Sequence, residues 1–208
     1  MGDVRYSSLV ISAGVVAVYF LQLSLPAVNG LAFVASDFLQ EPWTILTSIF
    51  LHSPGDYMHL LNNLFFLAVF GFMLENIVGT RKFLVLFFSS GMFANLSAFI
   101  FYPYSPVLGA SGAISGIIAA LAAIKPRTVG LLWGVPVPMW AAFLGWAAFN
   151  TLGGLATGGS TAFEAHLFGL FYGLLWGLFI REKHSGGSER SDPEPDLDLE
   201  EWEEKYMG

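Results

Sequence analysis

Two side chains capable of chemistry lie in apolar parts of the chain: Ser111, in a Gly-Ala-Ser-Gly segment, and His166, in an Ala-His pair. Polar and ionisable groups are costly inside a bilayer, so they mark functional sites by default. A serine hydroxyl is a weak nucleophile until a neighbouring base removes its proton, and neutral histidine suits that task near pH 7. If the two side chains meet, they form a nucleophile and its general base.

Groups that would stabilise the resulting oxyanion are also present. Ser111 opens an apolar run, and the first turn of a helix offers unpaired backbone N–H groups and a positive dipole end. His59 and Asn63 share a helical face, because they are four residues apart, and are further candidate donors. Taken alone, a His or Asn in a membrane helix is more often an interhelical hydrogen-bonding group. No aspartate lies at the depth of His166 and Glu164 falls on another face, so we expect a dyad.

Composition indicates an integral membrane protein. Of the 208 residues, 55% are hydrophobic and 12% are charged, with a mean hydropathy of +0.62. Soluble domains carry about 25% charged residues. The chain has no cysteine, which excludes disulfides, thiolate nucleophiles and thiolate metal sites. We expect no metal and no cofactor.

Long uncharged stretches predict six membrane passes. The first is taken as a retained helix, because no small-residue cleavage site follows it. Pro136 and Pro138 are expected to kink the fifth pass or to delay its start by a turn. The sequence therefore predicts an all-α polytopic membrane protein, with a six-helix membrane domain over residues 1–183. Its passes cover about residues 8–25, 57–78, 83–101, 111–124, 131–152 and 162–180.

The segments outside the passes predict the orientation. Residues 26–56 are too polar to span and contain an apolar helical face, which favours a long, partly helical loop in the membrane interface. With six passes, all nine Lys and Arg fall on the side of the N-terminus. The positive-inside rule then puts both termini in the cytoplasm of a multi-pass cell-membrane protein. Residues 184–208 are predicted to be an acidic, disordered cytoplasmic tail.

The reactive residues are expected at one depth. Counting 1.5 Å per residue from the cytoplasmic helix ends puts Ser111, His166 and Asn63 about 21, 22 and 24 Å up, within a core about 30 Å thick. Small residues let helices approach closely in lipid, so the glycine stripes beside Ser111 and His166 are expected to join their helices. The predicted packing glycines are Gly109, Gly112, Gly116, Gly169 and Gly173.

Together these segments resemble the rhomboid intramembrane serine proteases of the prokaryotic six-helix type, over about residues 8–182. The likeness rests on His-x-x-x-Asn at 59–63, Gly-x-Ser-Gly at 109–112 and Ala-His at 165–166 with glycines beyond it, in order on the expected passes. The resemblance implies Ser111 as nucleophile and His166 as general base. It implies His59, Asn63 and the Ser111 backbone N–H as the oxyanion hole.

The resemblance also implies the substrates and the route to the site. Such enzymes hydrolyse peptide bonds in or near transmembrane segments, at a site that opens to the external side. The fifth pass is a proposed gate in the family. Here it would present aromatic side chains that are equally typical of packing or lipid-facing positions, namely Trp140, Phe143, Trp146 and Phe149.

Two positions depart from the family pattern. The first loop has Trp43-Thr44 where Trp-Arg is common, so any network through that arginine must be absent or replaced. Position 115 is Ser, where an aromatic side chain often stacks on the catalytic imidazole. Either the fourth and sixth passes approach more closely, or the histidine ring is held otherwise.

Two other classes of protein fit parts of the pattern. A non-catalytic relative that binds transmembrane helices would typically lack the serine, the histidine or the glycine before the serine, and all are present here. A transporter or channel usually needs buried charges on several passes, which the uncharged stretches do not supply. We expect transmembrane protein substrates and the lipid bilayer as partners, and no nucleic acid; the oligomeric state is left open.

Overall fold

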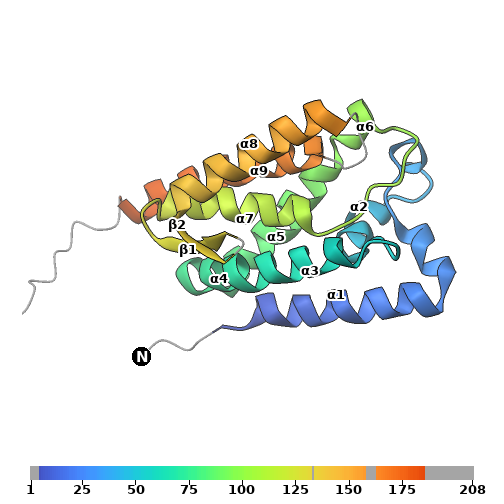
Figure 1. Cartoon of the computed structure of the whole chain (residues 1–208), viewed down its shortest axis with the longest axis horizontal. Coiled ribbons are helices and arrows are strands. Elements are labelled where there is room, and N and C mark those ends of the chain that lie inside the picture. Colours follow the sequence, from blue (N-terminus) through green and yellow to red (C-terminus); the bar gives the residue numbers. More distant parts are fainter. Residues whose placement is uncertain (1–4, 133, 158–162, 186–208) are drawn as a thin grey trace, which may run out of the picture.

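The computed structural model describes residues 5–132, 134–157 and 163–185, which form a helical bundle with one small hairpin (Figure 1). The predicted tail lies outside the described residues from position 186 on. The helices are α1 Ser7–Ser24, α2 Thr44–Thr47, α3 Tyr57–Phe66, α4 Phe72–Val78, α5 Thr80–Asn95, α6 Ala98–Phe101, α7 Ser111–Ile124, α8 Met139–Thr157 and α9 Phe163–Ser185. The strands are β1 Val129–Leu132 and β2 Val135–Pro138.

Four helical segments in the described part of the chain are long and apolar enough to cross a membrane: Ser7–Ser24, Tyr57–Val78, Thr80–Phe101 and Phe163–Arg181. The second comprises α3 and α4, joined by the π-helical turn Leu67–Gly71. α7 is apolar but shorter. A mostly helical protein with several membrane-spanning helices is thus confirmed, whereas the count of six passes stays a prediction.

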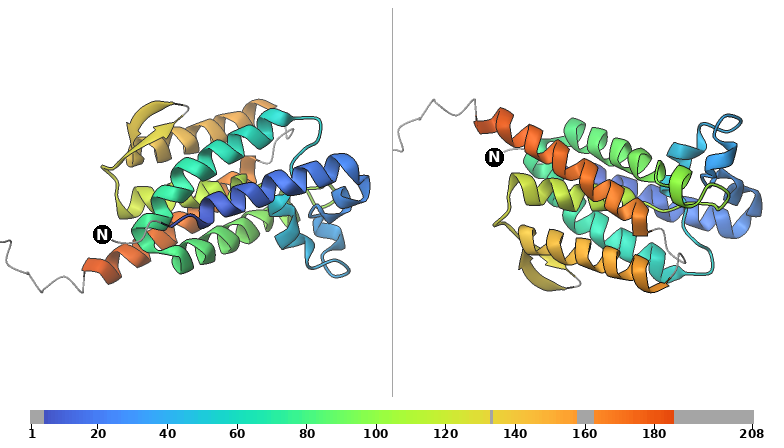
Figure 2. Two further views of the ribbon diagram at one scale, coloured as in Figure 1. Left: turned by 90° about the horizontal axis from the view of Figure 1, so that it is seen from below. Right: turned by 90° about the horizontal axis from the view of Figure 1, so that it is seen from above.

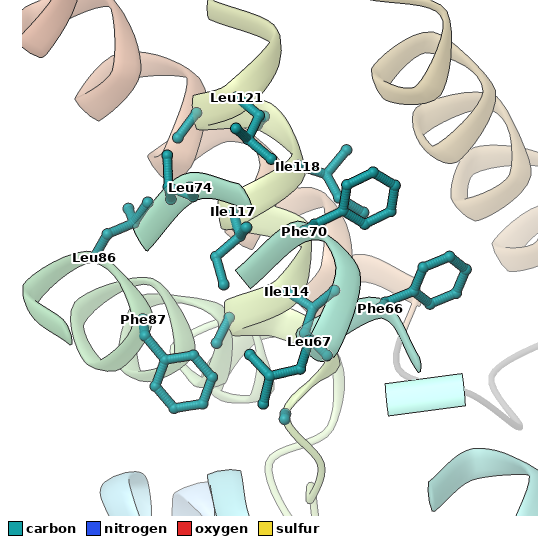
Figure 3. Close-up of a cluster of buried hydrophobic side chains, with 14 of the residues drawn as sticks. Phe66, Leu67, Phe70, Leu74, Leu86, Phe87, Ile114, Ile117, Ile118 and Leu121 are labelled. Carbon is teal, nitrogen blue, oxygen red and sulfur yellow. The ribbon is translucent and has the colours of Figure 1, made fainter. Parts of the chain in front are cut away.

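α7 is the central helix of the bundle. Its residues from Gly112 to Leu121 are all buried, and a helix that is apolar on every side is one enclosed by its neighbours. α8 and α9 cover one side of it, and α1 lies on the opposite side of the molecule (Figures 1 and 2). Large apolar side chains of the second segment and of α5 pack around it (Figure 3), among them Phe66, Leu67, Phe70, Leu74, Leu86 and Phe87.

α7 and α9 touch backbone to backbone. A methyl group at Gly169 would lie 2.1 Å from the carbonyl oxygen of Gly112, and one at Gly173 would lie 2.0 Å from that of Gly116. Ser90 of α5 reaches the same contact, where its Oγ donates to the carbonyl oxygens of Gly112 and Gly169 at 3.4 and 3.5 Å. Four of the five predicted packing glycines therefore lie where these two helices meet.

Glu75 anchors the start of α1. Its carboxylate accepts hydrogen bonds from the backbone N–H groups of Ser7 and Ser8, at 3.1 and 2.9 Å, and from Thr80 Oγ1 at 2.8 Å. A carboxylate at a helix N-terminus satisfies unpaired donors and interacts favourably with the dipole. This contact joins α1 to α4 and α5 at one end of the bundle.

The long first loop is built from short helical turns held by neighbouring segments. Phe33 forms an antiparallel bridge with Val107, in the loop that leads to α7. Asn95 of α5 donates from Nδ2 to the carbonyl oxygen of Ile45 at 2.8 Å and to Ser48 Oγ at 2.9 Å. The loop is thereby fixed to the segment that positions Ser111.

Thr44, at the position where the resemblance led us to expect arginine, bonds within the loop. Thr44 is buried, and its Oγ1 donates to the carbonyl oxygen of Glu41 at 2.6 Å, within the loop itself. The connections from this part of the loop to the helices come from Asn95 instead.

The fifth predicted pass was wrong at both ends. Residues 131–138 lie largely in the antiparallel hairpin of β1 and β2, a short interruption in a chain that is otherwise helical, as predicted. Pro136 and Pro138 lack the N–H that a helix interior requires, but the edge of a two-stranded hairpin tolerates them. α8 begins at Met139 and continues to Thr157, beyond the predicted end at residue 152.

The other predicted bounds need smaller corrections. α1 ends at Ser24 rather than at residue 25, and the third segment begins at Thr80 rather than at residue 83. α9 runs from Phe163 to Ser185, past the predicted end at residue 180.

The backbone contact predicts a strong effect of one methyl group. Gly173→Ala should lower the thermal unfolding midpoint in detergent, because the added Cβ meets the Gly116 carbonyl oxygen at 2.0 Å and forces α7 and α9 apart. Overpacking of this kind costs about 1–3 kcal/mol. Gly14→Ala is the matched control, since nothing lies within 4 Å of a methyl group there. Equal midpoints for the two variants would contradict the contact.

Candidate active site

Ser111 and His166 meet near the starts of α7 and α9. Ser111 is the first residue of α7, and its Oγ lies 2.7 Å from Nε2 of His166. Gly112 directly follows Ser111, and Gly169 lies one turn after His166. The backbone contact between these glycines therefore sets the distance between the hydroxyl and the imidazole.

A third polar side chain reaches the imidazole from α8. Asn150 Oδ1 lies 2.5 Å from His166 Nδ1, and the Asn150 side chain is fully buried. The rings of Trp146 and Phe163 flank the imidazole, with centroids 6.2 and 6.3 Å away. Asn150 was not among the predicted site residues, because only a carboxylate was considered as the third group. Its polar amide, within the uncharged fifth predicted pass, could have indicated a site residue.

Ser115 occupies the position where the family often has an aromatic ring. Its Oγ donates to the Ser111 carbonyl oxygen at 2.8 Å and accepts a hydrogen bond from Trp146 Nε1 at 2.9 Å. The aromatic ring beside the histidine thus comes from α8, and the small Ser115 leaves room for it. Both expected substitutes for the missing aromatic side chain at position 115 are present. The imidazole is held by Asn150 and two rings, and α7 and α9 are in backbone contact.

Gly109 was predicted to pack between helices, and that prediction is wrong. It lies in the loop before α7 with a φ of 118°, a conformation that favours glycine. A methyl group there would lie 2.8 Å from His59 Nε2 and 3.6 Å from Ser111 Oγ. The absence of a side chain therefore lets the His59 ring approach Ser111.

Asn63 is buried one turn beyond His59 on α3. Its Nδ2 donates to the His59 carbonyl oxygen at 2.8 Å, and its Oδ1 has no partner among the described residues. The side chain lines the cavity that contains Ser111. Nδ2 carries two N–H groups, and one of them bonds to His59. The other could donate a hydrogen bond to an oxyanion.

Ser111 and His166 lie at the junction of two cavities. One has a volume of about 140 Å³ and is mostly apolar, with walls that include Phe66, Ile114, Trp146 and Phe149. The other, of about 410 Å³, is more polar and lies against the loops at this end of the bundle, including Ser53, Asp56, Pro106 and Leu108. A polar cavity of that size holds water, which hydrolysis requires.

Glu164 takes no part in this arrangement. It accepts a hydrogen bond from the hydroxyl of Tyr102, in the segment that follows α6. The carboxylate is therefore engaged away from the imidazole, although it lies two residues before His166.

His52 is a fully buried histidine that was not among the predicted site residues. Its ring centroid lies 5.0 Å from that of His59. The Gln22 amide pairs with its backbone, donating to the carbonyl oxygen and accepting from the N–H, both at 3.0 Å. Burial, and then the neighbouring His59, lower the pKa of His52 to about 4. The ring is neutral near pH 7 and packs beside His59 without charge repulsion.

The chain belongs to the rhomboid family. Residues 39–183, more than half of its length, match the Rhomboid domain. The resemblance drawn from the sequence motifs is thereby confirmed, and with it a multi-pass membrane protein.

Its relatives include proteins named as proteases and proteins named as inactive. It is 33% identical to Rhomboid protein 1, mitochondrial, of Saccharomyces cerevisiae over 153 residues, 69% of this chain and 43% of that protein. It is 38% identical over 81 residues to Rhomboid protease GluP of Bacillus subtilis, 39% of this chain and 15% of that protein. It is 27% identical over 149 residues to Inactive rhomboid protein 1 of Drosophila melanogaster, 71% of this chain and 10% of that protein. The chain spans less than half the length of each.

The buried, neutral His52 predicts a pH-dependent loss of stability. Between its ordinary pKa of 6.5 and the folded value of about 4, the unfolded chain binds a proton that the folded chain excludes. Stability should therefore fall as the pH is lowered through this window. His52→Leu should show a smaller fall in thermal midpoint over the same range. Parallel midpoint curves for wild type and His52→Leu would contradict the assignment.

Proposed function

We propose that this rhomboid protein is an intramembrane serine endopeptidase that cleaves transmembrane protein substrates with Ser111 and His166. The observation that carries the proposal is the 2.7 Å contact between Ser111 Oγ and His166 Nε2 at the junction of two cavities. A hydroxyl within reach of a neutral imidazole is the minimal arrangement for covalent acyl transfer.

In the first half of the reaction, His166 Nε2 takes the Ser111 proton while Oγ attacks the scissile carbonyl carbon. The carbonyl oxygen of the tetrahedral intermediate carries the negative charge. The Ser111 backbone N–H, at the start of α7, donates to it, with His59 and Asn63 as further donors. His166 then gives its proton to the leaving nitrogen, and the C–N bond breaks.

In the second half, water replaces the amine. A molecule from the polar cavity loses a proton to His166 Nε2 and attacks the acyl-enzyme carbonyl. Collapse of the second tetrahedral intermediate returns the proton to Ser111 Oγ and releases the new carboxyl terminus. The polar walls supplied by Ser53 and Asp56 support this route, because they keep water within reach of an otherwise apolar site.

The proposed topology has six passes, with both termini in the cytoplasm and the site near the external side. The start of α1, the α4–α5 turn, the end of α7 and the end of α9 lie at one end of the bundle (Figure 1). Basic residues in these places are Arg5, Arg81, Lys82, Lys125, Arg127 and Arg181. Their clustering supports a cytoplasmic face there, and Ser111 lies at the opposite end of α7.

We further propose that substrates pass beside α8. Two of its four predicted gate aromatics, Trp146 and Phe149, line the apolar cavity next to Ser111. Trp140 is more than half exposed and belongs to the outer surface of the helix. A segment entering between α8 and the second membrane segment would reach Ser111 directly.

The alternative is a rhomboid protein that binds transmembrane helices without cleaving them; one relative is named as inactive. Ser111 and His166 in hydrogen-bonding contact favour the enzyme. Catalytic turnover separates the two functions, because a binding protein needs neither side chain to be reactive.

Ser111→Ala and His166→Ala should each abolish cleavage of a transmembrane reporter in proteoliposomes, since either change removes the nucleophile or its base. The matched control is Ser89→Ala on α5, whose hydroxyl, among the described residues, bonds within its own helix to the Val85 and Leu86 carbonyl oxygens. That variant should cleave at the wild-type rate. Cleavage that persists in purified Ser111→Ala would overturn the proposal.

A further inference from the structure

Asn150 is the polar side chain of this site that neither the motifs nor the proposed dyad accounts for. It lies within α8, directly after Phe149, and is 0% exposed. Burying an amide in an apolar helix is costly unless its groups are paired. Both of its polar atoms are paired here, one of them with His166.

The contacts of the amide fix which way it points. Asn150 Nδ2 donates to the Trp146 carbonyl oxygen, one turn earlier on α8, at 2.7 Å. The nitrogen can donate to a carbonyl but the amide oxygen cannot, so Oδ1 is the atom that faces His166 Nδ1 at 2.5 Å. Because Oδ1 only accepts, Nδ1 of His166 must carry the hydrogen.

This orientation selects the tautomer that a general base needs. A neutral imidazole with its hydrogen on Nδ1 has a free lone pair on Nε2. That lone pair faces the Ser111 hydroxyl at 2.7 Å and accepts its proton. With the hydrogen on Nε2 instead, the ring would donate to Ser111 and be unable to act as its base.

α8 holds the same pair of helices by a second polar contact. Trp146 Nε1 donates to Ser115 Oγ, and Ser115 in turn donates to the carbonyl oxygen of Ser111. Trp146 and Asn150 lie one turn apart and contact α7 and α9 respectively. The imidazole contact therefore exists only while α8 is packed against the helices that carry Ser111 and His166.

We infer that Asn150 is a positioning residue, which accepts a hydrogen bond from His166 Nδ1 and so holds the imidazole in the tautomer and orientation that activate Ser111. The inference rests on the proposed function for its consequence, but the contact itself is a property of the resting protein. The orienting acceptor is a neutral amide supplied by α8, where other serine hydrolases use a carboxylate.

Two substitutions separate this role from packing. Asn150→Leu keeps the approximate volume and removes the acceptor, whereas Asn150→Asp keeps an acceptor toward Nδ1 and removes the donor to Trp146. Thr151→Val is the matched control, because Thr151 Oγ1 makes the same kind of bond, to the Ala147 carbonyl oxygen, but is exposed on the next position of α8. Reporter cleavage gives kcat and KM for each, and thermal midpoints show which variants are folded.

Asn150→Leu should lower kcat by about 10-fold or more with KM little changed, a smaller loss than the roughly 10⁴-fold that follows removal of a charged orienting carboxylate. Asn150→Asp and Thr151→Val should stay within about threefold of wild type. The inference is overturned if folded Asn150→Leu keeps the wild-type kcat. It is equally overturned if folded Asn150→Asp loses as much as Asn150→Leu, because the donor to Trp146 would then be the group that matters.

A second measurement needs no turnover and leaves Asn150 unchanged. Nitrogen NMR of wild-type protein labelled with ¹⁵N-histidine, with the His166 signals assigned by their loss in His166→Ala, reports which ring nitrogen carries the hydrogen at neutral pH. Hydrogen on Nδ1 supports the inference, and hydrogen on Nε2 overturns it. If wild type cleaves no reporter, the proposed function fails, while this spectrum still decides the contact with Asn150.

Discussion

The structure depends on one contact, the meeting of α7 and α9 without intervening side chains. Gly169 and Gly173 face the carbonyl oxygens of Gly112 and Gly116, and any larger residue would separate the helices. Within lipid there is little hydrophobic driving force between helices, so close packing and polar contacts must hold them together. The hydroxyl of Ser111 and the imidazole of His166 lie at one end of this contact, where a shift of about 1 Å would remove the hydrogen bond between them.

The other polar groups follow from the same constraint, since each buried one needs a partner when water is scarce. Ser90 bonds to the glycine carbonyl oxygens, Ser115 to Trp146, and Asn150 to His166. The two departures from the family pattern become intelligible in these terms. The small Ser115 leaves room for the Trp146 ring of α8, and next to Thr44 the Asn95 amide ties the loop to α5.

Sequence was most informative at residues that are unfavourable in a membrane helix unless they serve function or close packing. Ser111, His166, His59 and Asn63 stood out because polar groups are rare in apolar runs, and all four line one cavity. Glycine spacing indicated the backbone contact. Periodicity and charge could not indicate the hairpin at residues 129–138, whose apolar residues suit a membrane helix as well as a strand. Asn150 was missed because its partner lies on a different helix, and only the packing of α8 against α9 brings it to the imidazole.

Labelling with a serine-directed fluorophosphonate shows whether Ser111 is an activated nucleophile, because the reaction requires a hydroxyl activated by its neighbour and no substrate. We expect one phosphonylated residue, Ser111, located by digestion of the labelled protein and mass spectrometry of its peptides, and no adduct in His166→Ala. An unlabelled Ser111, or labelling that is unchanged when His166 is removed, would mean that the two side chains meet without forming a nucleophile and its base.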